Sequence, residues 1–288
     1  MMVTEKIHAI KIPFNVPVSP EMLIDRFAFA YLIPGSNIHL IDSGIAGAET
    51  IIFDYIKKIG RNPNEISSLI LSHSHPDHIG AAKTIKDQTG CTVFAHKNER
   101  NWIENTDLQR KERPVPGFPT LVGGPVKVDH LVEGGMLLQL EDGITCQVIN
   151  TPGHSNGSIS LFFEKEKSLF TGDALAFPGD LPIYEDISDC LASIKTLQQL
   201  SNVEHFFSSW EPPIRGQESI AKRMDESVTF LRRIHNEVMR NIVIDNNMDL
   251  MELCQKVVSE LGLPPFAANP LVAKAFASSV AADKGLWN

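Results

Sequence analysis

The chain has 288 residues, of which 43% are hydrophobic and 21% are charged, and its formal net charge is −9. This composition is typical of a globular protein and excludes a disordered, fibrous or membrane-embedded class. The negative charge repels polyanions, so we expect a small-molecule substrate and no nucleic-acid partner.

Short strands followed by a helix are predicted in the first part of the chain. The strand that ends at Ile41 runs into Asp42-Ser43-Gly44, a turn signal. Apolar residues recur at helical spacing over residues 49–60, where Gly60 is a plausible C-terminal stop. The predicted strands are 7–12, 27–33, 38–41 and 69–71.

Strands mixed with helices continue to about residue 215 and predict a layered α/β protein. The helices are expected at 79–88 and 187–200, and the strands at 92–95, 137–140, 144–149, 159–163 and 203–207.

After Arg215 the pattern becomes helical, with predicted helices at 220–242, 249–261 and 270–282. We therefore predict two domains, 1–215 and a helical subdomain 216–288. The apolar stripe from Leu250 to Leu261 must pack against something. The larger domain is the simplest partner, and a homodimer or the substrate pocket are the alternatives.

Residues 110–125 contain four prolines and three glycines and read as a long loop. Loops of this length often act as lids over a binding site. A solvated, floppy connection fits the sequence equally well.

The start of the chain and the cysteines bear on location. The first twenty residues contain three prolines and no long apolar run, so neither a signal peptide nor a membrane span is expected. Four cysteines stand far apart without a CxxC pair, which argues against disulfides and a cysteine zinc site. We predict a cytoplasmic protein that does not bind membranes.

The segment His73-Ser74-His75-Pro76-Asp77-His78 carries the strongest chemical signal. With ten histidines in the chain, a random window of six residues would hold only about 0.2 of them. Side chains two residues apart on an extended segment point the same way, so His73 and His75 can bind one ion. Asp77 and His78 are then left for a second ion, and a common metal partner explains why these side chains gather.

Two later segments each place one more candidate ligand after a predicted strand. Thr151-Pro152-Gly153-His154 follows the strand that ends at Asn150, and Thr171-Gly172-Asp173 follows Leu169-Phe170. Taken singly, His154 and Asp173 would each be a weak signal. An Asp in a turn more often caps the turn than binds a metal.

The order HxHxDH, TPGH and GD, with the early Ile41-Asp42-Ser43-Gly44, resembles the metallo-β-lactamase-fold superfamily of metal-dependent hydrolases over roughly residues 7–215. The resemblance implies an α/β fold arranged as a four-layer αββα sandwich, with metal at the strand edge. Asp42 would orient the ligands without binding the metal. The implied ligands are His73, His75 and His154 for the first ion and Asp77 and His78 for the second, with Asp173 bridging.

The sequence departs from the family pattern in the turn after the last strand. Trp210 stands where a histidine ligand is expected, and indole cannot bind a metal. Glu211 or His205 could substitute, or the second ion could be weakly bound or absent. We expect one or two Zn²⁺ ions, with Fe or Mn as alternatives, especially at the second position.

A metal ion lowers the pKa of bound water toward about 7, so a hydroxide nucleophile is available at neutral pH. Asp77 could pass the proton to the leaving group. We therefore predict a hydrolase acting on a small ester, thioester or lactone. A di-iron redox protein and a non-catalytic metal- or ligand-binding sensor are the alternatives, and a phosphodiesterase or nuclease is less favoured.

Overall fold

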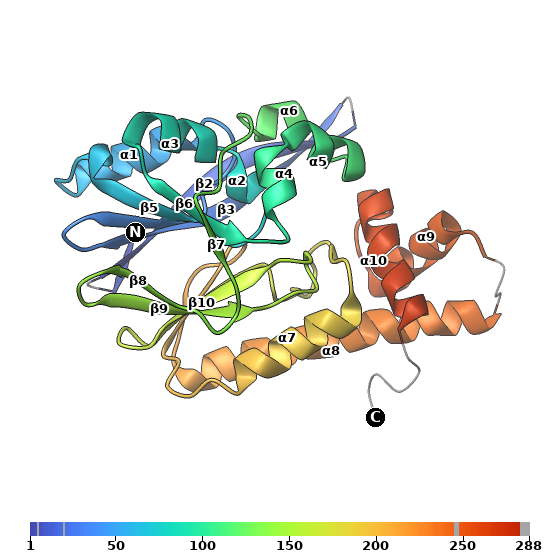
Figure 1. Cartoon of the computed structure of the whole chain (residues 1–288). Coiled ribbons are helices and arrows are strands. Elements are labelled where there is room, and N and C mark those ends of the chain that lie inside the picture. The colour runs from blue at the N-terminus through green and yellow to red at the C-terminus, as the bar shows by residue number, and fades with distance from the viewer. Residues whose placement is uncertain (5, 20, 245–247, 283–288) are drawn as a thin grey trace.

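The computed structural model describes residues 1–4, 6–19, 21–244 and 248–282. Two β-sheets stack face to face, with helices covering both outer faces (Figure 1). The predicted α/β fold with αββα layers is therefore confirmed. In the described part of the chain, every helix is too short or too polar to cross a membrane.

The first sheet has seven strands in chain order, antiparallel from β1 to β4 and parallel from β4 to β7. The expected strands 7–12 and 27–33 belong to a longer hairpin formed by β2 and β3. On its other side, β2 pairs with β1 only near the start of β2. Beyond that point β2 is an edge strand, which tolerates Pro13 and Pro17. The strands are β1 (Met2–Thr4), β2 (Ile7–Ser19), β3 (Met22–Pro34), β4 (Ile38–Ile41), β5 (Ile66–Ile70), β6 (Thr92–His96) and β7 (His130–Val132).

The second sheet has six strands in the order β13-β12-β11-β10-β9-β8, antiparallel except for the pair β11 and β12. Each expected strand of this region is present. Its strands are β8 (Leu137–Glu141), β9 (Ile144–Asn150), β10 (Ile159–Phe163), β11 (Ser168–Gly172), β12 (His205–Ser208) and β13 (Ile214–Arg215).

Helices α1 (Ala48–Lys58) and α3 (Ala82–Thr89) cover the first sheet, and α7 (Ile187–Gln198) and α8 (Gln217–Ile244) cover the second (Figure 1). The helix expected at 79–88 begins at Ala82 as α3, and the short helix α2 (Pro76–Ile79) precedes it; the Gly80 carbonyl between them accepts a 2.9 Å hydrogen bond from the Gly123 amide. The remaining helices are α4 (Arg100–Glu104), α5 (Thr106–Glu112), α6 (Phe118–Leu121), α9 (Leu250–Leu261) and α10 (Pro270–Ala281), with 3-10 turns η1 (Pro63–Glu65) and η2 (Pro265–Ala267).

Three apolar clusters fill the spaces between the four layers. One lies under α1 and α3, one lies between the sheets, and one joins the second sheet to α7–α10. The stripe side chains Leu253, Val257, Val258 and Leu261 are buried in the third cluster. The C-terminal helices therefore share a core with the rest of the chain.

The expected long loop at 110–125 is partly helical, so that prediction was wrong in part. The segment contains the end of α5 and the whole of α6, and Phe118 and Leu121 are buried. Tertiary burial of these two apolar side chains orders a segment that its prolines and glycines made look irregular.

Candidate metal centre

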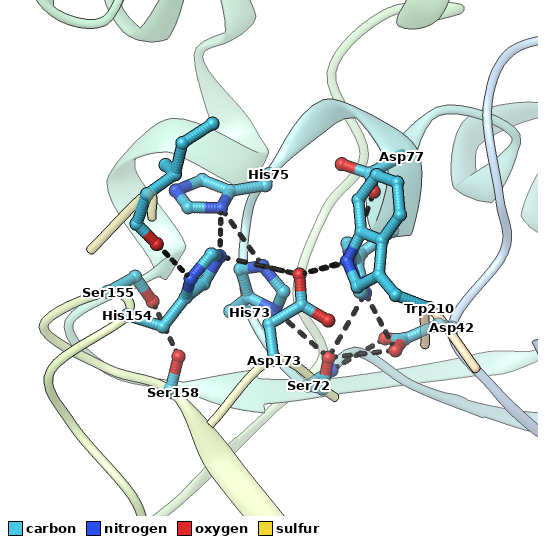
Figure 2. Close-up of polar contacts among 12 residues, drawn as sticks. Asp42, Ser72, His73, His75, Asp77, His154, Ser155, Ser158, Asp173 and Trp210 are labelled. Carbon is cyan, nitrogen blue, oxygen red and sulfur yellow. Dashed lines mark hydrogen bonds and ion pairs between the residues drawn. The ribbon is translucent and has the colours of Figure 1, made fainter. Parts of the chain in front are cut away.

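Three strand ends bring the predicted ligands together at one edge of the stacked sheets (Figure 2). His73 and His75 follow β5, and α2 starts directly after them, which turns Asp77 and His78 toward the same point. His154 follows β9 and Asp173 follows β11. Segments far apart in sequence therefore meet in one cluster.

The ring nitrogens of three histidines converge. His73 Nε2 lies 3.0 Å from His75 Nδ1, and His75 Nδ1 lies 2.8 Å from His154 Nε2. Nitrogens bound tetrahedrally to zinc at about 2.0–2.1 Å lie about 3.3 Å apart. Small side-chain adjustments would thus make these three nitrogens a face of a zinc site.

A second group of possible ligands consists of His73, His78 and Asp173, and Asp173 also lies close to His154 of the first group. Asp173 Oδ2 lies 3.4 Å from His154 Nε2 and 3.3 Å from His78 Nε2. Asp77 Oδ2 lies 3.4 Å from the same His78 nitrogen. The structure therefore brings all six predicted ligands together.

Several buried atoms of the cluster have no hydrogen-bond partner among the described residues. They are His75 Nε2, Asp77 Oδ2, His78 Nε2 and Asp173 Oδ1. Buried polar atoms are rarely left without a partner in native proteins. The donor set of imidazole nitrogens and carboxylate oxygens fits a divalent cation.

Contacts behind the cluster fix how each ring faces. His154 Nδ1 donates a 2.8 Å hydrogen bond to the Ile183 carbonyl, so Nε2 faces the cluster. His78 Nδ1 donates to Asp42 Oδ2 at 2.9 Å. The same carboxylate accepts hydrogen bonds from the Ser72 amide at 2.8 Å and hydroxyl at 2.7 Å. Asp42 thus holds the His78 ring from behind and lies outside both groups of donors that could hold an ion.

Burial and charge set the protonation of the cluster. Burial holds the pKa of His73 and His75 well below the usual histidine value and lowers that of His154. Burial also acts to lower the pKa of His78, but Asp173, Asp77 and Asp42 raise it well above its ordinary value. Three neutral imidazoles consequently offer lone pairs at neutral pH.

Glu99 is a buried residue of the site that sequence reasoning missed. Its carboxylate is buried and accepts hydrogen bonds from the Ser74 amide at 2.9 Å, the Ser155 hydroxyl at 2.8 Å and the Gly157 amide at 2.6 Å. Glu99 therefore ties the His73–His75 loop to the His154 loop. Only its position shortly after the end of β6 could have drawn attention to it.

Trp210 occupies the position expected for a histidine, and its Nε1 donates a 2.7 Å hydrogen bond to Asp173 Oδ2. The suggested substitutes do not join the cluster. Glu211 pairs with Arg223 at 2.9 Å, and His205 lies beside Ser168 at the opposite end of β11 from Asp173. Neither belongs to a group of donors that could hold an ion within the described residues.

A cavity of about 600 Å³ opens onto the cluster. His75, Asp77, His154 and Asp173 line one side of it, and apolar side chains line most of the rest. The apolar wall includes side chains from the β2–β3 hairpin, the 113–121 segment and the start of α10: Phe14, Val16, Val18, Ile24, Pro114, Val115, Pro116, Leu121 and Leu271.

Comparison with known proteins decides the family. The family model described as "Metallo-beta-lactamase superfamily" matches residues 23–207, more than half of the chain. This protein belongs to the metallo-beta-lactamase superfamily of metal-dependent hydrolases. Superfamily membership implies that the cluster binds divalent metal, and the two donor groups fit that role.

Individual relatives of this metallo-beta-lactamase superfamily member are distant. The probable metallo-hydrolase YqgX of Bacillus subtilis is 32% identical over 164 residues, covering 56% of this chain and 70% of that protein. A hydroxyacylglutathione hydrolase of Hyphomonas neptunium is 28% identical over 191 residues, covering 66% and 63%. A solved metallo-beta-lactamase family protein from Thermus thermophilus has a TM-score of 0.76 at 19% identity, covering 97% of this chain and 94% of that one. At this low identity, the comparison with the solved structure shows only that the fold is shared.

Proposed function

We propose that this hydrolase cleaves a small ester, thioester or lactone whose acyl part is apolar. The observation that carries the proposal is the cavity of about 600 Å³, which opens onto the metal cluster and is lined mainly by apolar side chains. Pockets of this size bury most of a small molecule and use few polar groups for orientation. A compact acyl compound fits that chemistry better than a phosphodiester.

We assign His73, His75 and His154 as the ligands of the principal ion, which we take to be zinc, with Asp173 beside it. When bound, such an ion polarises a carbonyl oxygen and lowers the pKa of water. The neutral state of the three imidazoles supports the assignment, because protonated histidines cannot bind a cation.

Asp77 is the proposed proton carrier. Its Oδ2 lacks a hydrogen-bond donor among the described residues, and the residue lines the cavity beside His75. A carboxylate in this position can accept a proton from the attacking water and deliver it to the leaving oxygen or sulfur. The same residue would help to hold a second ion with His78 and Asp173.

Trp210 donates a hydrogen bond to Asp173 where a further metal ligand would be expected, so we propose one principal ion and a weaker second one. The relatives support hydrolysis over a redox role, and the hydroxyacylglutathione hydrolases among them act on a thioester by name. That thioester activity is part of the proposal for this chain.

A substrate panel tests the proposal. Protein purified without added metal is analysed for metal content and then assayed on acetyl and hexanoyl 4-nitrophenyl esters, the matching thioesters, a hexanolactone and bis(4-nitrophenyl) phosphate. We expect turnover of the acyl compounds, with the hexanoyl members preferred over the acetyl ones. Turnover confined to the phosphodiester, or none above the His154→Ala variant, would contradict the proposal.

A further inference from the structure

One charged residue of the cavity, Arg113, forms no salt bridge with the residues that the structure describes. Arg113 follows α5 and lines the cavity with His75, Asp77, His154 and Asp173. It is only 9% exposed, and its guanidinium makes no hydrogen bond or ion pair with any residue that the structure describes. An arginine is always charged, so burying it without a partner costs free energy.

The position of Arg113 is fixed by its neighbours. Its amide donates a 2.8 Å hydrogen bond to the carbonyl of Gln109, which is fully buried. The Gln109 side-chain Nε2 donates in turn to the Ser74 carbonyl, between His73 and His75. The end of α5 is therefore attached to the loop that carries two of the metal ligands.

The carboxylates that act on Arg113 each have another partner, and for Asp77 it is His78, whose Nε2 lies 3.4 Å from Asp77 Oδ2. Burial lowers its pKa, while Asp77, Glu185, Glu99 and Asp173 act to raise it. Glu99 accepts hydrogen bonds from four groups of the ligand loops, and Asp173 accepts one from Trp210. Glu185 lies 3.5 Å from Lys274. None of the four lies within ion-pair distance of Arg113, so its N–H groups are left for something in the cavity.

The other arginine among the described cavity residues is already paired. Arg26 donates to both oxygens of Asp180, at 2.8 and 3.1 Å, and lies over the Trp210 ring at 4.3 Å. The cavity thus offers one unpaired cation beside the metal cluster, among the residues that the structure describes, and apolar walls elsewhere.

On the basis of the proposed function, we propose that Arg113 binds a carboxylate of the substrate, so that the substrate is an acyl compound with an apolar body and one anionic end. The planar guanidinium matches a carboxylate through two parallel hydrogen bonds. A phosphate dianion fits poorly, because Asp77, Asp173 and Asp180 line the same cavity and only one described cation there is free. Arg113 is therefore a residue that determines specificity.

A matched pair of esters tests this role in the metal-loaded enzyme. One is the 4-nitrophenyl half-ester of adipic acid, and the other replaces its free carboxylate by a carboxamide. We expect the wild type to prefer the carboxylate by about tenfold to a hundredfold in kcat/KM, the range for a charge-assisted pair. Arg113→Gln should remove the preference while changing kcat/KM on the carboxamide by less than about threefold. Arg113→Lys should keep part of the preference.

The control is Arg26→Gln, which removes a cavity charge that is already paired and should leave the preference in place. A wild type without preference, or a preference that survives Arg113→Gln, would overturn the role. A melting temperature of Arg113→Gln well below wild type, with equal loss on both esters, would make Arg113 a structural residue and also overturn it. An unchanged or higher melting temperature is expected, because the buried charge is gone.

A binding measurement tests the role of Arg113 independently of hydrolysis, and therefore independently of the proposed function. Calorimetry compares hexanoate with hexanamide on the metal-loaded protein, and a carboxylate held by the metal alone would bind Arg113→Gln as well as wild type. We expect hexanoate to bind more tightly than hexanamide to wild type, and the difference to fall in Arg113→Gln. If neither ester is hydrolysed but this difference appears, the proposed function fails and the role of Arg113 stands. Equal affinity of hexanoate for wild type and Arg113→Gln would contradict the role of Arg113 in binding a carboxylate.

Discussion

The indole Nε1 of Trp210 donates a 2.7 Å hydrogen bond to Oδ2 of Asp173, a carboxylate of the second group of possible metal ligands that also lies 3.4 Å from His154 of the first. A hydrogen-bond donor thus stands where a further nitrogen ligand would be expected. The two groups share His73, so once His73 binds the ion of the three-histidine group, the second position relies on His78 and carboxylate oxygens. The two positions should therefore differ in metal affinity.

We predict one tightly bound and one weakly bound ion in the wild type. Trp210→His should tighten the weak position by at least about tenfold, because it adds an imidazole nitrogen facing Asp173. Isothermal titration with Zn²⁺ and with Mn²⁺ measures both affinities.

Two variants serve as controls for that titration. Trp210→Phe removes the donor without adding a ligand, so the second position should stay weak. Glu211→Gln should change neither affinity, because this carboxylate pairs with Arg223. Two equally tight ions in the wild type would refute the asymmetry.

Removing one of the convergent histidines should release the principal ion. His73→Ala or His154→Ala leaves the ion with an incomplete ligand set, and we expect metal affinity and hydrolysis to fall by at least about a hundredfold. His205→Ala is the matched control, since His205 lies at the other end of its strand. Circular dichroism should show an intact fold, and metal bound at wild-type stoichiometry in either variant would remove that residue from the ligand set.

Gly153 holds the turn that presents His154. Its φ is 122°, and an added Cβ would overlap the Cys190 amide nitrogen. We predict that Gly153→Ala destabilises the fold by about 1–3 kcal/mol through backbone strain and contact with Cys190, and weakens metal binding by displacing His154. Gly179→Ala is the control, because Gly179 also has a positive φ but nothing lies near its added Cβ. Equal unfolding free energies for the two variants would show that the contact with Cys190 is unimportant.

Leu271 tests whether the C-terminal helices shape the substrate site. It stands at the start of α10 and lines the cavity, whereas Val280 on the same helix is 42% exposed. Leu271→Trp should fill part of the cavity and lower kcat/KM for hexanoyl esters more than for acetyl esters, by roughly tenfold. Val280→Trp should leave the ratio unchanged. If both variants behave alike, α10 does not contact the acyl chain.

Local patterns predicted most helices and strands, because burial on one face imposes helical or alternating spacing on the sequence. The pairing of His73 with His75 could be read from their spacing on an extended segment. The approach of His154 and Asp173 depends on how the strands are ordered, so it required a family resemblance. The length of the β2–β3 hairpin was underestimated because prolines at an unpaired edge do not end a strand.

Glu99 and Arg113 could not be found from the sequence. Each is one charged residue among many in a polar stretch, and it becomes distinctive only through burial by other parts of the chain. For Glu99 that burial provides hydrogen-bond partners, and for Arg113 it provides none within the described residues.

Metal titration of chelated wild-type protein tests the central claim most directly. Zn²⁺ is added in small steps while hydrolysis of the hexanoyl thioester and bound metal are measured together. We predict no turnover without metal, turnover that rises in proportion to the first equivalent bound, and no such response in His154→Ala. Turnover by the metal-free protein, or metal binding at the first position without any hydrolysis, would contradict the account.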